Sequence, residues 1–279
     1  MFMRAPLLVL TAVSGSGLIA CAVPAPEPTG TDPTSSTATA IVVVERTAGP
    51  GDATRGDAVI ARFVRVSQGA VDDPALRIAG VAEDIPAPGA CFAPSDNSPV
   101  IQGRSVELLN VGQVVLTSDN AAKSTVLLPR SMPDPAGVVS GVFYSARSAD
   151  VFSPGSRVSL RSQGGEDLLD GFAVSVTAPR EVTDVHVAPT STGLEVSWDP
   201  VDTDPHDLFY VDVLSPAPRV ALRCTGVDSS HLVVPQSSIA GIEEGQLAIH
   251  RLHKESFKAK GIEPGEVRFD VAKLVTFRR

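Results

Sequence analysis

Short runs of alternating apolar and polar residues recur along most of the chain, and long helical periodicity is absent. In "RVSLRS", Val158 and Leu160 point to one side of an extended chain, while Arg157 and Arg161 point to the other. Strands at this spacing, separated by Gly, Pro, Asp and Asn, are typical of antiparallel β-sandwiches. The sequence therefore predicts an all-β fold.

The expected strands follow from these runs. They cover residues 41–46, 58–66, 104–110, 112–117, 124–128, 138–144, 156–162, 171–177, 182–187, 193–198, 208–214, 219–224, 231–235, 245–251 and 266–276. Only "KESFKAKG", residues 254–261, is expected to be helical, with Gly261 ending it after one or two turns. The stretch 47–57 is rich in Gly, Pro and Asp and is expected to be a loop that holds the tripeptide Arg55-Gly56-Asp57.

Pro179 marks the expected boundary between two β-sandwich domains, residues 41–179 and 180–279. In the second, "VTDVHV", "LEVSWDP" with Trp198, and "FYVDV" are followed by four more expected strands. This part resembles a fibronectin type III or immunoglobulin-like module, which implies a seven-stranded sandwich. The corner tyrosine of that family is missing from "EGQLAIHRL", so an immunoglobulin-like sandwich is the expectation.

The beginning of the chain has the parts of a secretory signal. Arg4 is followed by an apolar stretch, which is too short and too interrupted for a membrane span. "LIAC", ending at Cys21, resembles the lipobox of bacterial lipoproteins. The resemblance implies that residues 1–20 are a signal peptide and that the Cys21 thiol carries lipid. Ala22 follows, where an Asp retains such proteins in the inner membrane, so the resemblance implies an envelope lipoprotein of the outer membrane in a Gram-negative cell.

Residues 21–40 are rich in Pro, Thr, Ser and Ala and carry little bulky apolar surface. Such a segment cannot bury enough area to offset the entropy of ordering, so a disordered tether is expected. The formal net charge of the chain is −9, and cleavage after residue 20 would remove Arg4 and no acidic residue. This acidity argues against nucleic acid as a partner.

Two cysteines remain once Cys21 is assigned to the lipid. Cys91 and Cys224 lie in different expected domains of an exported protein, where disulfides form. They are either bridged across the domains or two small buried residues. In "RVALRC", Cys224 shares its side of the strand with Val220 and Leu222, so its thiol is expected to face the core.

The sequence offers weak candidates for site chemistry. The loop "DPVDTDPHDLF" brings together Asp199, Asp202, Asp204 and Asp207, which are oxygen ligands of the kind that Ca²⁺ prefers, although the spacing of an EF-hand is missing. His250 and His253 are expected to be surface residues and not metal ligands. The carboxylates of "GGEDLLDG", Glu166, Asp167 and Asp170, follow an expected hairpin turn.

Two functions fit these observations. The first is a non-enzymatic envelope lipoprotein that displays two β-sandwiches on a tether, either as a structural module or to bind a protein or glycan partner. The second is an envelope hydrolase whose site lies in the irregular domain 41–179. No catalytic motif such as G-x-S-x-G or H-E-x-x-H occurs, and no catalytic residue is assigned.

Overall fold

A computed structural model describes residues 38–49, 55–66, 77, 79–80, 83–94, 106–119, 124–132, 139–148, 150–199, 204–205, 207–214, 220–227 and 230–279. The expected signal peptide, Cys21 and most of the expected tether lie outside these residues. The first strand begins at Ala38, and the side chains of Ala38 and Ala40 are buried. The fold therefore starts within the segment 21–40 that the composition predicts to be disordered.

Every run marked by the alternation contains a strand, and the all-β prediction is confirmed. The strands before residue 179 are β1 (Ala38–Ala48), β2 (Arg55–Val66), β3 (Cys91–Phe92), β4 (Val106–Leu108), β5 (Val114–Ser118), β6 (Thr125–Ser131), β7 (Val139–Ser148), β8 (Arg157–Ser162) and β9 (Phe172–Thr177). Those after it are β10 (Thr183–Pro189), β11 (Gly193–Asp199), β12 (Asp207–Leu214), β13 (Val220–Thr225), β14 (His231–Pro235), β15 (Glu244–Ala259) and β16 (Ile262–Arg278). A 3-10 turn, η2, covers Gln236–Ile239.

Two local predictions are wrong. The segment 254–261 is not a helix, because β15 continues to Ala259 and pairs with β16 almost to the hairpin turn at residues 260–261. Long pairing with a neighbouring strand here overrides the local helical preference. The tripeptide beginning at Arg55 is not in a loop either, because β2 begins there and the side chain of Asp57 is buried.

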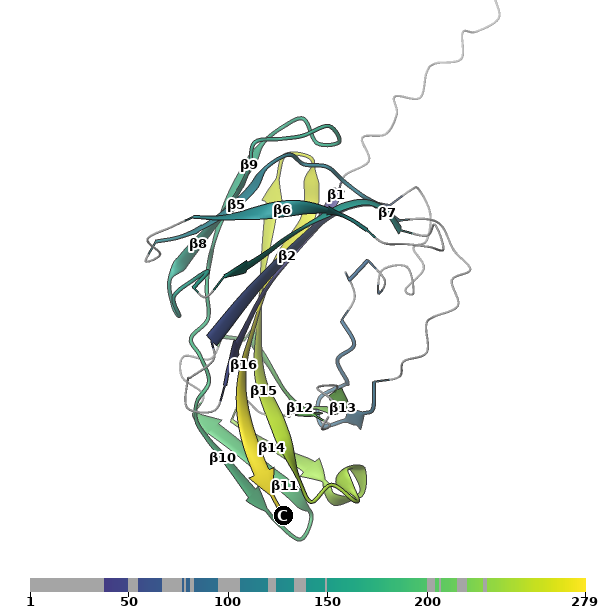
Figure 1. Cartoon of the computed structure of the whole chain (residues 1–279), viewed down its shortest axis with the longest axis vertical. Coiled ribbons are helices and arrows are strands. Elements are labelled where there is room, and N and C mark those ends of the chain that lie inside the picture. The colour runs from purple at the N-terminus through teal and green to yellow at the C-terminus, as the bar shows by residue number, and fades with distance from the viewer. Residues whose placement is uncertain are drawn as a thin grey trace, which may run out of the picture. The chain divides into compact units, whose positions relative to one another are not determined.

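Thirteen strands form one curled sheet in the order β3-β13-β12-β15-β16-β1-β2-β4-β7-β6-β5-β8-β9, and β10-β11-β14 form a second sheet (Figure 1). Most pairings are antiparallel, as predicted, but β1 pairs with β16 and β4 pairs with β7 in parallel. The β1–β16 pairing joins the segments before and after residue 179 into one sheet.

Two large hydrophobic cores divide the fold, and a smaller third cluster is formed by Val64, Ala79, Val106, Leu108 and Val139. The first lies where the curled sheet packs on itself, with Val42, Phe63, Leu116, Leu160 and Phe269 among its buried residues. Aromatic rings meet edge to face in this core, which adds specific geometry to the burial.

The second core lies between β10-β11-β14 and the strands β13, β12, β15 and β16. Trp198 of β11 packs there against Phe209 of β12, with ring centres 5.6 Å apart. The four strands of one layer and the three of the other are the seven strands predicted for residues 180–279.

The hairpin β15-β16 belongs to both cores. Near its turn, Phe257 and Ile262 pack in the first core, whereas Leu247 and Phe277 at its base pack in the second. Strands of 16 and 17 residues are long enough to cross from one core to the other. The core of the segment 41–179 is therefore completed by residues from the segment 180–279.

Charged side chains separate the two cores. Arg46 of β1 pairs with Asp57 of β2, and both side chains are almost wholly buried. Glu181 also contacts Arg46, at 3.2 Å. Ala178 packs in the first core and Val182 in the second, so the chain passes between the two cores here. We call the charged side chains at this level, which include Arg46, Asp57 and Glu181, the charged layer.

Candidate functional site

The predicted calcium loop does not present its four aspartates together. Asp199 ends β11 and Asp204 is exposed, while Asp202 lies outside the described residues. Asp207 begins β12, and its carboxylate turns inward to bind Arg251 at 2.6 Å and His253 at 2.8 Å. Within the described ranges, no group of three or more His, Cys, Asp or Glu side chains could hold a metal ion.

The environment of Asp207 favours its ionised form. Desolvation acts against the charge, but the hydrogen bonds from His253 and Arg251 outweigh it and hold the pKa of this carboxyl below its ordinary value. Its side chain is 1% exposed. Asp207 therefore joins strands β12 and β15 in the charged layer and is not presented as a surface ligand.

The two histidines, which were expected at the surface, are partly buried. The side chains of His250 and His253 are 14% and 12% exposed, and each is hydrogen-bonded to an aspartate. They point to opposite sides of β15, because positions three apart alternate in a strand. His253 lies in the charged layer, and His250 lies on the other face of the sheet.

The three carboxylates of "GGEDLLDG" make different contacts and do not form a common site. Asp167 accepts a hydrogen bond from the backbone of Asn110 at 2.7 Å, and Asp170 pairs with Lys260 at 3.1 Å. Glu166 is exposed. The Gly165 amide donates to the Leu168 carbonyl around a bend at Glu166 and Asp167.

Cys91 and Cys224 form a disulfide, which settles the alternative left open by the sequence. The bridge connects β3 to β13, where the two residues lie directly opposite each other. Cys224 is 1% exposed and packs in the second core, so the predicted direction of its side chain is confirmed. The bridge joins residues on either side of the expected boundary at 179.

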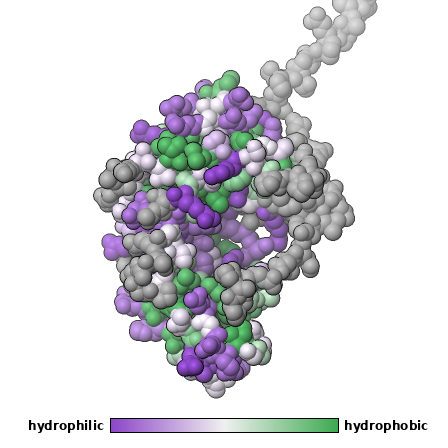
Figure 2. All heavy atoms as spheres, viewed as in Figure 1, coloured by the Kyte–Doolittle hydropathy of each residue, from purple (hydrophilic) through white to green (hydrophobic). Residues whose placement is uncertain are grey.

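Side chains that point away from both cores cover one face of β13, β12, β15, β16, β1 and β2, and we call this surface the polar face. It carries Glu45, Arg62, Tyr210, Asp212, Arg223, His250, Lys254, Glu266, Arg268 and Asp270. Figure 2 shows hydrophilic residues gathered in a hollow at the middle of the viewed face. A concave surface rich in hydrogen-bonding groups is the candidate functional site.

A connected network lies at the centre of the polar face. The ring of His250 stacks on Tyr210 at 4.2 Å between centres. Asp270 accepts hydrogen bonds from the Tyr210 hydroxyl at 2.7 Å and from His250 Nδ1 at 2.8 Å. Arg223 binds both oxygens of Asp212 at 2.7 Å, and its guanidinium lies 4.6 Å from the Tyr210 ring centre.

The network shifts the pKa values of neighbouring groups in different directions. Desolvation and then the charge of Asp270 raise the pKa of Tyr210 far above its ordinary value. Desolvation opposes ionisation of Asp270, but His250 and Tyr210 outweigh it and lower the pKa of that carboxyl. Glu45, the register partner of Asp270, remains exposed, yet desolvation by its surroundings and then the Asp270 charge raise its pKa.

A segment that we call the strap, residues 83–92, crosses the polar face from β16 to β13. Glu83 pairs with Lys254 at 2.6 Å and with Arg268 at 3.1 Å. The carbonyl of Asp84 accepts a hydrogen bond from Arg223. The disulfide between Cys91 and Cys224 holds the end of the strap on β13.

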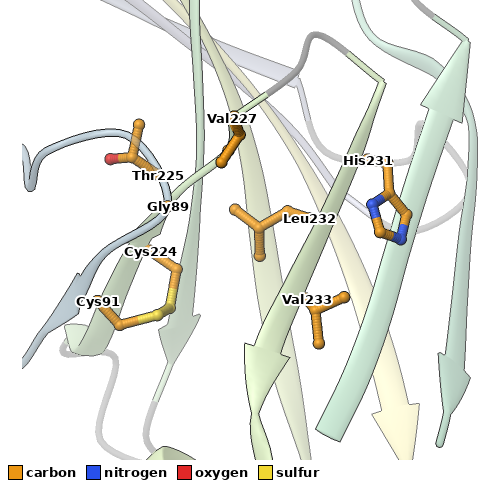
Figure 3. Close-up of a pocket in the computed structure, with 9 residues that line it drawn as sticks. Gly89, Cys91, Cys224, Thr225, Val227, His231, Leu232 and Val233 are labelled. Atoms are coloured by element: carbon orange, nitrogen blue, oxygen red, sulfur yellow. A yellow bond between two sulfur atoms is a disulfide. The ribbon is translucent and has the colours of Figure 1, made fainter. Parts of the chain in front are cut away.

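A small pocket of about 260 Å³ lies beside the disulfide. Figure 3 shows the bridge on one side of it and Val227, Leu232 and Val233 around it. Val227 is 81% exposed. The pocket belongs to the second sandwich and is lined mainly by apolar groups, so it differs in chemistry from the polar face.

Searched against protein-family models and against curated proteins, the chain matches none. None of the helical residues in the described part of the chain forms a helix long and apolar enough to cross a membrane.

Proposed function

We propose that the protein is an envelope-anchored lipoprotein whose β-sandwiches act as a non-enzymatic binding module, and that the polar face binds a glycan. Lipid on Cys21 anchors the chain, the segment after it acts as a tether, and residues 180–279 form a module similar to fibronectin type III. The observation that carries the binding role is the polar face, where Glu45 is exposed and the side chains of Arg223, His250 and Asp270 are 14–20% exposed, above the buried Tyr210 and Asp212. Such groups match the hydroxyls of a sugar, whereas a protein interface favours an apolar centre.

The geometry of His250 supports binding over hydrolysis. Its Nδ1 faces Asp270 at 2.8 Å and its Nε2 faces Asp212 at 3.6 Å. A general base must instead direct a nitrogen at the proton that it removes. Both nitrogens of this imidazole serve the network, which keeps the surface rigid for a ligand.

An envelope hydrolase is the alternative, and one observation favours it. Glu45 and Asp270 are adjacent carboxyls whose pKa values are moved in opposite directions. Such a pair can divide the roles of acid and base in glycan hydrolysis. New reducing ends released from a glycan by the wild-type protein, and lost in Glu45→Gln, would favour this alternative over binding.

Cys21→Ser is expected to move the protein from the membrane fraction to the soluble fraction and to abolish labelling with a radioactive fatty acid. Stable anchoring needs about two acyl chains, and this substitution removes the thiol that the lipobox resemblance assigns to lipid. Cys91→Ser with Cys224→Ser is the matched control and should remain in the membrane. Unchanged fractionation and labelling of Cys21→Ser would contradict the anchor.

Glu45→Trp is expected to weaken binding of the full chain to isolated cell-envelope glycan by about tenfold or more. The exposed position tolerates substitution, but the indole covers the neighbouring part of the polar face and removes a carboxylate that can accept hydrogen bonds from sugar hydroxyls. The measurement is co-sedimentation with the glycan at a series of protein concentrations. Glu244→Trp, at an exposed position at the start of β15, is the control and should bind as wild type. Equal binding by both variants would argue against the polar face.

A further inference from the structure

We infer that Arg62 binds an acidic group, a carboxylate or a phosphate, on the glycan held by the polar face. This inference rests on the proposed function, because it names the class of ligand for the same surface. It begins from an arginine whose hydrogen-bonding capacity the described residues leave unused.

Arg62 lies on the face of β2 that points away from the first core. Its register partner on β1 is Ile41. Its Nε is buried without a hydrogen-bond partner among the described residues. A buried donor without a partner costs about 1–3 kcal/mol, so such a group calls for an explanation. This Nε has less than 1 Å² of exposed surface, so a ligand would bind the terminal nitrogens of the guanidinium, to which the described residues supply no hydrogen bond.

The surroundings hold this guanidinium in place. Gly80 lies against it in a left-handed conformation, with φ +66°, and a Cβ at that position would be 2.5 Å from the Arg62 Cζ. A Cβ there would displace the guanidinium, and the left-handed backbone itself favours glycine. The side chain is thus positioned by the backbone of the 79–80 turn, and not by an acidic partner.

The charges around Arg62 favour an external anion. Arg268, the nearby cation, is engaged by Glu83 and Glu266. Glu45 acts on Arg62 electrostatically, but no ion pair joins them in the described part of the chain. Desolvation lowers the pKa of Arg62 most strongly. The charge of Glu45 raises it and the repulsion of Arg268 lowers it, so the pKa stays below its ordinary value. The negative charge of a bound anion would offset both the desolvation cost and the repulsion.

Guanidinium chemistry fits this ligand. Arginine presents planar, paired N–H donors that match the two oxygens of a carboxylate or phosphate. The exposed Glu45 and the partly exposed Asp270 are then available for the uncharged hydroxyls of the same sugar chain, whereas Tyr210 and Asp212 are buried. The inferred ligand is therefore an acidic oligosaccharide, and not a free anion.

The test compares binding of tetragalacturonate, which carries carboxylates, with that of maltotetraose, which is neutral, to the full chain by calorimetry at low salt. We expect the wild type to prefer tetragalacturonate by about tenfold or more, and Arg62→Gln to lose this preference. Arg65→Gln is the matched control. Arg65 lies on the same strand and also has a buried Nε without a partner, but its terminal nitrogens bind Glu107 and the Asp167 carbonyl.

Three results would overturn the inference: no preference for the acidic sugar in the wild type, an equal loss in Arg65→Gln, or full competition by inorganic phosphate at the sugar's own concentration. The last would indicate a free-anion site. Thermal unfolding of both variants checks that neither has lost its fold. If Glu45→Trp still lowers binding to envelope glycan, the proposed function stands although this inference fails; if it does not, both fail.

Discussion

Asp57→Ala is expected to lower the free energy of unfolding by about 3–5 kcal/mol. The substitution leaves the Arg46 guanidinium charged and buried, since Asp57 binds it through both oxygens at 2.7 and 2.6 Å. It also removes the acceptor for the Val151 amide. Urea unfolding followed by circular dichroism measures the loss.

Two variants test the cause of this loss. Glu107→Ala breaks the partly exposed pair between Arg65 and Glu107, so it should cost less than about 1 kcal/mol. Arg46→Met combined with Asp57→Leu removes both buried charges and should recover much of the stability lost by Asp57→Ala. A loss below about 1 kcal/mol for Asp57→Ala would show that the buried pair is not important for joining the two cores.

Replacing both Cys91 and Cys224 with Ala is expected to lower the free energy of unfolding by about 2–5 kcal/mol. The bridge joins residues 133 apart in the sequence, so it restricts a long loop in the unfolded chain. In the folded protein it also holds the two-residue strand β3 on β13. Urea unfolding under non-reducing conditions measures the first effect.

Limited proteolysis measures the local effect of the same change. Cleavage within the strap, residues 83–92, is expected to become faster in the double variant because backbone contacts alone then hold it. Cys21→Ser, which leaves the bridge intact, should be cleaved like wild type. Equal cleavage and equal stability of the double variant would contradict a role of the disulfide in holding the strap.

The sequence predicted the strands well because period-two alternation depends on local burial, as in Leu194, Val196 and Trp198 of β11. It failed where pairing overrode local preference, as at residues 254–259 of β15. It also missed β3, since two residues carry no periodicity and this strand exists through its pairing and disulfide with β13.

The polar face was not predicted as a site. A signal was present, because Glu45, Asp212, His250 and Asp270 all occupy the outward positions of strands with apolar inward positions. The alternation gives the side of the strand to which each residue points. It does not give the order of strands in the sheet, and the parallel pairing of β1 with β16 connects segments more than two hundred residues apart.

The central claim is that the polar face is the ligand-binding surface. Carboxyl footprinting tests it most directly: the full chain is labelled with a carbodiimide and an amine, with and without bound envelope glycan, and modified residues are located by mass spectrometry. The account predicts that labelling of Glu45 falls several-fold on binding while labelling of Glu244 is unchanged. Unchanged labelling of Glu45, with protection of Asp199 or Asp204 instead, would place the ligand on the loop after β11 and contradict the account.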